Sequence, residues 1–114
     1  MLKTLAQYFI VFALVWRDGN IDGIRQICGA HAVSRLSVFG SALTDRFNDD
    51  SDIDFLVSFD TMPIEDYADN YLQLMTALGD LLGREIDLVE DKAIRNPVFR
   101  ENVDRTKVQI YGRV

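Results

Sequence analysis

Two periods of hydrophobic and polar residues run along this chain and predict its regular elements. Alternation with a period of two predicts short strands over residues 35–40 and 53–59. The segment 85–90, with Ile86, Leu88 and Val89 as its apolar residues, predicts a third. Apolar residues of 64–82 recur at intervals of three and four, which predicts a long amphipathic helix. Gly83 stands just past that pattern, where glycine commonly ends a helix.

Shorter helices are predicted on either side of these elements. Isoleucines at helical spacing predict a helix over 21–28, with Asn20 or Asp22 as its cap. Residues 91–105 predict one or two short helices, and Pro97 suits the first turn of the second one.

The connections between the elements predict the fold class. The polar loop 42–51 joins the first two strands without room for a crossover helix, so these strands are expected to pair antiparallel. Residues 108–111 predict a closing strand or an extended tail. We therefore expect an α/β chain of the α+β kind, a small mixed β-sheet with helices on one or both faces.

The segment 5–16 is apolar except for Gln7 and is too short to cross a bilayer, which takes about 20 residues. Three interpretations stay open: a buried or partner-covered helix, an upstream extension, or a targeting or membrane-associated segment. We divide the chain into an apolar N-terminal extension, 1–19, and one domain, 20–114.

Composition and charge narrow the functional classes. The 114 residues, 48% of them apolar, suit one globular domain, and the net charge of −6 disfavours a general nucleic-acid binder. The single cysteine, Cys28, cannot form an internal disulfide, so we expect a reducing compartment, the cytoplasm. One cysteine and one histidine, His31, exclude a His/Cys zinc site within one chain. Cys28 fits a buried helix face and His31 a helix end, so neither is expected to be catalytic.

Three aspartates predict a metal site. Asp52 and Asp54 stand two residues apart at the start of a predicted strand, so both side chains project from one face. A divalent cation would remove their mutual repulsion, and carboxylate oxygens suit Mg²⁺ or Mn²⁺. Asp87 lies within the otherwise apolar stretch 86–89, where an acid is costly unless it is paired or metal-bound. If the two strands are neighbours, the three carboxylates converge.

Gly40 and Ser41 follow the first predicted strand and form a candidate phosphate site. Glycine lets the backbone approach a phosphate closely, and serine adds a hydroxyl. A phosphate site beside three carboxylates predicts two-metal phosphoryl or nucleotidyl transfer. Each motif alone is more typical of a solvated turn, so the hypothesis depends on their combination. Glu85 and Glu90, which flank Asp87, are expected to be solvent-exposed charges.

The run Val38-Phe-Gly-Ser41, the ten-residue gap after it and Asp50-Ser-Asp-Ile-Asp-Phe-Leu-Val57 resemble the signature of the polymerase-β-like nucleotidyltransferases. The similarity is closest to the minimal nucleotidyltransferase (MNT) domain, as in MntA-type antitoxins. It extends over about residues 20–114 and includes Gly83-Arg-Glu-Ile-Asp-Leu-Val89 as the strand of the third carboxylate.

The resemblance implies a role for each candidate residue. Asp52 and Asp54 would hold two Mg²⁺ ions, and Asp87 would complete the metal site and help to activate an attacking hydroxyl. Gly40 and Ser41 would bind the triphosphate of the substrate, ATP. The hydroxyl attacks the α-phosphorus and pyrophosphate leaves. In the antitoxin branch the acceptor is a tyrosine of a HEPN-type toxin, which AMP transfer silences.

The chain departs from this family pattern at Ala42 and Thr44, where many members carry arginine. The phosphate charge would then be met by metal, backbone and either Arg46 or Arg84. The departure leaves a second hypothesis open, a non-catalytic antitoxin that neutralises its partner by binding alone. A third is a small-molecule nucleotidyltransferase completed by another chain. We expect a protein partner and a possible homo- or hetero-oligomer, with no membrane and no direct nucleic-acid contact.

Overall fold

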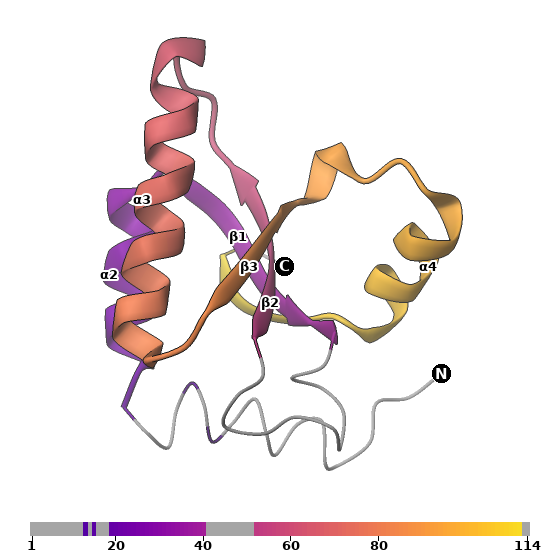
Figure 1. The fold of residues 1–114 in the computed structure, drawn as a ribbon, viewed down its shortest axis with the longest axis horizontal. Helices are drawn as coiled ribbons and strands as arrows, with labels where there is room; N and C mark the ends of the chain where they lie inside the picture. The colour runs from indigo at the N-terminus through magenta and orange to yellow at the C-terminus, as the bar shows by residue number, and fades with distance from the viewer. Residues whose placement is uncertain (1–12, 14, 16–18, 41–51, 113–114) are drawn as a thin grey trace.

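The computed structural model describes residues 13, 15, 19–40 and 52–112, whose helices lie on two sides of one β-sheet (Figure 1). The helices are α2 (Ile21–Ala30), α3 (Ile64–Leu82) and α4 (Pro97–Thr106), with a short 3-10 helix, η3 (Asp91–Ala93). The strands are β1 (Val33–Phe39), β2 (Ile53–Phe59), β3 (Ile86–Glu90) and β4 (Val108–Gly112). The expected class, a small mixed sheet with flanking helices, is confirmed.

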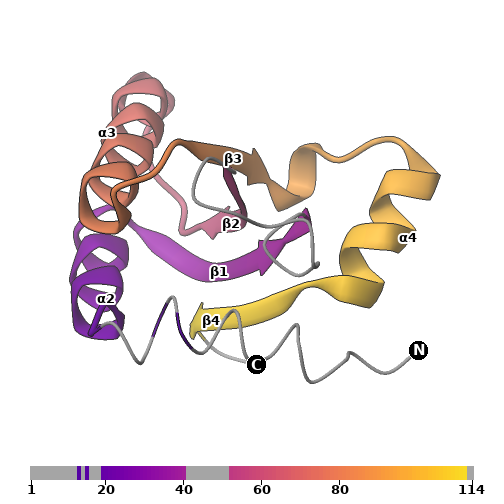
Figure 2. The ribbon, with the colours of Figure 1, turned by 60° about the horizontal axis from the view of Figure 1, so that its bottom comes forward.

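The sheet has the strand order β3-β2-β1-β4, with β3 and β4 at its edges (Figure 2). β1 pairs antiparallel with both β2 and β4, which confirms the pairing predicted from the short polar loop. β2 and β3 pair in parallel, because α3 carries the chain back to the end of the sheet where β2 began. The strand that contains Asp87 therefore lies directly beside the strand that contains Asp54.

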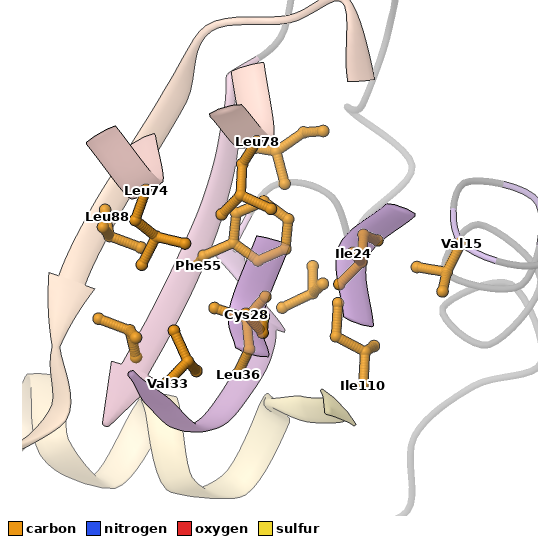
Figure 3. Close-up of a cluster of buried hydrophobic side chains, with 13 residues drawn as sticks. Val15, Ile24, Cys28, Val33, Leu36, Phe55, Leu74, Leu78, Leu88 and Ile110 are labelled. Atoms are coloured by element: carbon orange, nitrogen blue, oxygen red, sulfur yellow. The ribbon is translucent and has the colours of Figure 1, made fainter. Parts of the chain in front are cut away.

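Alternation along the strands divides the apolar residues between the two faces of the sheet. Ile53, Phe55 and Val57 of β2 belong to one large buried cluster with residues of α2 and α3 (Figure 3). The helices contribute mainly Ile24, Cys28, Leu74 and Leu78, all fully buried. This cluster is the main core, and its burial supplies the principal driving force for folding.

A smaller cluster lies on the opposite face, where α4 packs. It consists of Phe39, Leu56 and Val103, and the rings of Phe39 and Phe99 meet edge to face with their centroids 5.9 Å apart. Such an arrangement suits the ring quadrupoles. The cluster therefore fixes α4 near the end of β1, where Gly40 follows.

Local chemistry fixes two helix boundaries, and the first of them is the one that the sequence predicts. Gly83 ends α3 in the left-handed conformation with φ of 66°, and its N–H bonds to the carbonyl of Gly79 at 2.8 Å. The side chain of Asn96 caps α4 by accepting hydrogen bonds from the N–H groups of Val98 at 2.9 Å and Phe99 at 3.0 Å. Pro97, which was expected in the first turn of a helix, is the first residue of α4.

Removing the α4 cap tests its contribution. Asn96→Ala is expected to lower the free energy of unfolding by about 1 kcal/mol, because two N–H groups lose their acceptor. Urea denaturation measures the change. Asn102→Ala, at an exposed position in the same helix, serves as the control and should change stability by less than about 0.5 kcal/mol. Equal losses for both variants would contradict a capping role.

The apolar N-terminal segment is described at two positions. Ala13 is half-buried, and Val15 is fully buried in the main core cluster with Ile24 and Ile110 (Figure 3). This burial favours the interpretation of the segment as buried against the domain, while its other residues lie outside the described part. Within the described residues, no helix combines the length and the apolar character needed to cross a membrane.

Candidate functional site

The sheet brings two of the three predicted aspartates side by side. Asp54 of β2 and Asp87 of β3 are register partners in the parallel pair. Neighbouring strands lie about 4.8 Å apart, and partners in register project from the same face. That face is the one on which α4 packs, since Phe55 and Leu88, the next residues along, belong to the core under α2 and α3. Asp54 is half-buried and Asp87 is exposed, so the pair is open to a ligand.

Asp52 stands directly before β2 and is exposed. The alternation along the strand places it on the same side as Asp54. Among the described residues, however, no three or more His, Cys, Asp or Glu side chains form a group that could hold a metal ion. The structure therefore shows Asp54 and Asp87 as a pair, with Asp52 beside it but not in a three-ligand cluster.

Gly40 lies against this pair, at the end of β1. Its neighbour Phe39 is the register partner of Asp54. A Cβ atom at Gly40 would overlap Oδ2 of Asp54 and lie 3.1 Å from its Cγ. Gly40 also has φ of 75°, a conformation that residues with side chains rarely adopt. Two independent constraints thus require glycine here, and neither was predicted from the sequence.

The remaining phosphate-site candidates can be placed only in part. Ser41, Ala42, Thr44 and Arg46 lie outside the described residues. Arg84 is half-buried and precedes β3 by two positions. The adjacent Glu85 carbonyl accepts a hydrogen bond from the N–H of Ile53 at 3.1 Å, so this segment is tied to the start of β2. Arg84 therefore sits at the same end of the sheet as the aspartates.

The interaction of Arg100 with Asp91 fixes α4 to the segment that follows β3. The Arg100 guanidinium contacts Oδ1 of Asp91 at 2.5 Å and Oδ1 of Asp104 at 3.1 Å. It also donates to the Asp91 carbonyl at 3.1 Å. Charge-assisted bonds of this kind are the stronger ones in proteins. These bonds fix α4 to η3, the short helix that follows β3.

The prediction that Glu90 is a solvent-exposed charge is wrong. Its side chain is 12% exposed, accepts a hydrogen bond from the hydroxyl of Tyr67 at 2.6 Å and lies 3.6 Å from Nζ of Lys92. Burial, with the Glu90 hydrogen bond and charge, raises the pKa of Tyr67 to about 12. The helical periodicity of residues 64–82 includes Tyr67 among the positions of the apolar face, but it could not show that the Tyr67 hydroxyl reaches Glu90.

Cys28 and His31 behave as the sequence predicts. Cys28 is fully buried, and burial raises the pKa of its thiol to about 12, so the thiol stays protonated and unreactive near neutral pH. The Nδ1 atom of His31 lies 2.7 Å from the carbonyl oxygen of Ile27 at the end of α2. The His31 ring therefore interacts with the C-terminal end of α2.

Comparison with known proteins finds relatives along most of the chain. The family model described as polymerase beta, nucleotidyltransferase, matches residues 22–114. A Methanocaldococcus jannaschii protein, provisionally named a protein adenylyltransferase, is 34% identical over 80 residues, which cover 70% of this chain and 79% of the relative. The protein adenylyltransferase MntA of Thermococcus cleftensis is 28% identical over 89 residues, covering 71% and 87%.

Solved structures share the same fold. One is provisionally described as a minimal nucleotidyltransferase; it has a TM-score of 0.66 and 29% identity, and the match covers 81% of this chain and 90% of the other. Another is an AMPylated Shewanella oneidensis HEPN toxin in complex with an MNT antitoxin. That match has a TM-score of 0.57 and 22% identity, covers 85% and 73% of the two chains, and concerns the fold alone.

Proposed function

Because the chain belongs to the polymerase β nucleotidyltransferase family, we propose that it is a magnesium-dependent enzyme that transfers AMP from ATP to a tyrosine of a HEPN-type toxin. In this proposal the protein is the antitoxin of a cytoplasmic toxin–antitoxin pair, and residues 20–114 form the catalytic domain.

One observation carries the proposal: Asp54 and Asp87 are register partners and Gly40 lies against Asp54. A pair of carboxylates with the backbone of a glycine lying against one of them suits nucleotidyl transfer. The names of the relatives support protein adenylylation in particular, since two of them are called protein adenylyltransferases. A HEPN toxin that carries AMP, bound to an MNT antitoxin, supports the choice of acceptor.

The carboxylate ligands fit magnesium, because hard cations prefer carboxylate oxygens. Two adjacent acids also repel each other unless a cation is bound to them. Asp52, Asp54 and Asp87 would hold the ions, which when bound neutralise charge on the transferring phosphate. Gly40 and Ser41 would hold the triphosphate, and Arg84 is placed at the same end of the sheet to add positive charge.

The proposed reaction forms one bond and breaks another. The oxygen of the tyrosine hydroxyl bonds to the α-phosphorus of ATP, while the bond from that phosphorus to the oxygen bridging the β-phosphate breaks and pyrophosphate leaves. Asp87 is exposed and can accept the hydroxyl proton, since it reaches solvent and an incoming protein alike. The half-buried Asp54 is better suited to be a fixed ligand of the metal ions.

The test is AMP transfer itself. The protein, ATP labelled at the α-phosphate, Mg²⁺ and a HEPN-type toxin are mixed, and label on the toxin is followed by gel and mass spectrometry. We expect label on one or more tyrosines, dependent on Mg²⁺. Phosphate labelled at the γ-position should not transfer, which separates AMP transfer from phosphorylation.

The alternative is neutralisation by binding alone. The alanine and threonine at positions 42 and 44 favour it, because two cations that many family members place near the phosphates are absent. In that case the partner would stay unlabelled, yet the protein would still suppress its toxicity with both Asp52 and Asp54 replaced by alanine. That pair of results would exclude the enzymatic proposal.

A further inference from the structure

A small polar hollow lies on the α4 side of the sheet, between β1, β2 and the two ends of the segment that runs from η3 to β4 (Figure 1). Its volume is about 20 Å³, and Leu56, two residues after Asp54 on β2, is its apolar lining residue. The polar residues that line it are Arg35, Ser37, Ser58, Asp91, Lys107 and Gln109. None of them belongs to the candidate catalytic site, so the hollow is a separate feature of the same face.

Strand register gathers four of these side chains. Ser37 of β1 is the register partner of Gln109 in β4, and Arg35 of β1 is the partner of Ser58 in β2. Arg35 and Ser37 stand two residues apart, so both project from one face of the strand. The Cβ atoms of partners across strands lie about 5 Å apart, and alternate residues along a strand lie about 7 Å apart. A guanidinium, a carboxamide and two hydroxyls are therefore gathered around one spot.

Ser37 is buried, yet its hydroxyl has no hydrogen-bond partner in the part of the chain that the structure describes. The residue is 5% exposed and lines the hollow. Buried hydroxyls nearly always have a partner, because leaving one unpaired is costly. A group bound in the hollow would supply the missing acceptor.

The charges around the hollow leave one cation without a counter-ion among the described residues. Arg100 bonds to both Asp91 and Asp104, and Nζ of Lys107 lies 3.2 Å from the same Asp104. These two carboxylates are therefore already matched by two cations. Arg35 is exposed and forms no ion pair with any residue that the structure describes. The hollow is thus locally positive in a protein whose net charge is −6, and an anion is favoured there.

We propose that the polar hollow binds a small oxyanion of the phosphate class. Guanidinium and ammonium groups donate charge-assisted hydrogen bonds to such an anion, and the planar guanidinium of Arg35 matches the spacing of its oxygens. A tetrahedral phosphate also offers more acceptor oxygens than a carboxylate does to the hydroxyls of Ser37 and Ser58. One water-sized group needs about 10–15 Å³, so one or two oxygens fit within the hollow and the rest of the anion lies in its mouth, beside Arg35.

Thermal melts of the full chain in metal-free buffer test the proposal, with inorganic phosphate as the probe. Phosphate should raise the melting temperature in a saturable way, beyond the effect of chloride at equal ionic strength, because a ligand of the folded state stabilises it. Arg35→Gln and Ser37→Ala should each raise the dissociation constant for phosphate by about tenfold, since each removes one donor to a charged group. Arg35 is exposed and alanine fits in the place of serine, so both variants should fold.

The matched control is Arg25→Gln, which removes the same charge from α2, on the other face of the sheet. The Arg25 side chain is 64% exposed, and its loss should leave the dissociation constant within about twofold of the wild-type value. No stabilisation by phosphate beyond that by chloride would overturn the proposal. Equal phosphate binding by the wild type, Arg35→Gln and Ser37→Ala would also overturn it, because the ion would then lie elsewhere. Acetate that binds as tightly as phosphate would exclude the phosphate class.

AMP in place of inorganic phosphate identifies the source of the anion. Tighter binding of AMP than of phosphate, lost in Arg35→Gln, would support the phosphate group of a nucleotide as the occupant. Weaker binding of AMP, with phosphate binding lost in Arg35→Gln, would support the free ion. These measurements use no ATP, Mg²⁺ or toxin, and the hollow shares no residue with the candidate catalytic site. A failure of the phosphate site therefore leaves the proposed AMP transfer intact, and a failure of AMP transfer leaves the phosphate site intact.

Discussion

Asp54→Asn is expected to slow AMP transfer by about 10³-fold. The substitution keeps the size of the side chain but removes the negative charge from the register pair with Asp87. Metal coordination at such a site contributes several kcal/mol to the transition state, and about 4 kcal/mol corresponds to three orders of magnitude in rate. The rate constant for label transfer to the partner at saturating ATP is the measurement.

Thermal melts provide a second readout for Asp54→Asn that does not require the partner. Mg²⁺ should raise the melting temperature of the wild-type protein, because an ion that binds only the folded state stabilises it, and the variant should lose this response. Asp80→Asn, which removes an exposed acid from α3, is the control and should keep both activity and the Mg²⁺ response. Wild-type transfer by Asp54→Asn would exclude Asp54 from the catalytic site.

Gly40→Ala is expected to lower AMP transfer by about 10²-fold or more. The added methyl group would overlap Oδ2 of Asp54, and a φ of 75° costs alanine about 1–2 kcal/mol. Relief requires a shift of either the backbone or the carboxylate, and a displacement of about 1 Å in a catalytic group can cost two orders of magnitude. The variant should also melt at a lower temperature than the wild type.

Gly29→Ala is the matched control for Gly40→Ala. Gly29 lies in α2, where nothing stands within 4 Å of an added Cβ atom. Alanine is the better helix former, so this variant should gain up to about 1 kcal/mol of stability and keep full activity. If Gly40→Ala also kept full activity, the close approach of Gly40 to Asp54 would have no catalytic role.

The regular elements could be predicted closely where local chemistry decides them. The span of α3 was predicted over 64–82 because its apolar spacing and Gly83 both act locally, and α4 begins where Asn96 and Pro97 predict. The first strand was predicted too short, since it begins at Val33 rather than Arg35. Strand limits depend on pairing with β2 and β4, which are distant in sequence.

The candidate site was predicted by residue but not by arrangement. The residues Asp52, Asp54, Asp87 and Gly40 stand out in the sequence by type and spacing. That Asp54 faces Asp87 in register follows only from the parallel pairing of β2 with β3, and the overlap that excludes a side chain at Gly40 follows from β1 pairing with β2. The prediction for Glu90 was wrong because its burial also depends on a contact that is distant in sequence. Tyr67 of α3 covers it where α3 packs along the edge of the sheet.

By itself, the sequence determined the limits of α3, the start of α4, the antiparallel pairing of the first two strands and the identity of the acidic residues, because hydrophobic period and loop length act over a few residues. The tertiary structure alone decided which aspartates meet, why Gly40 must be glycine and that Glu90 is buried against Tyr67. These features arise from contacts between segments more than ten residues apart, and they exist only once the sheet has brought those segments together.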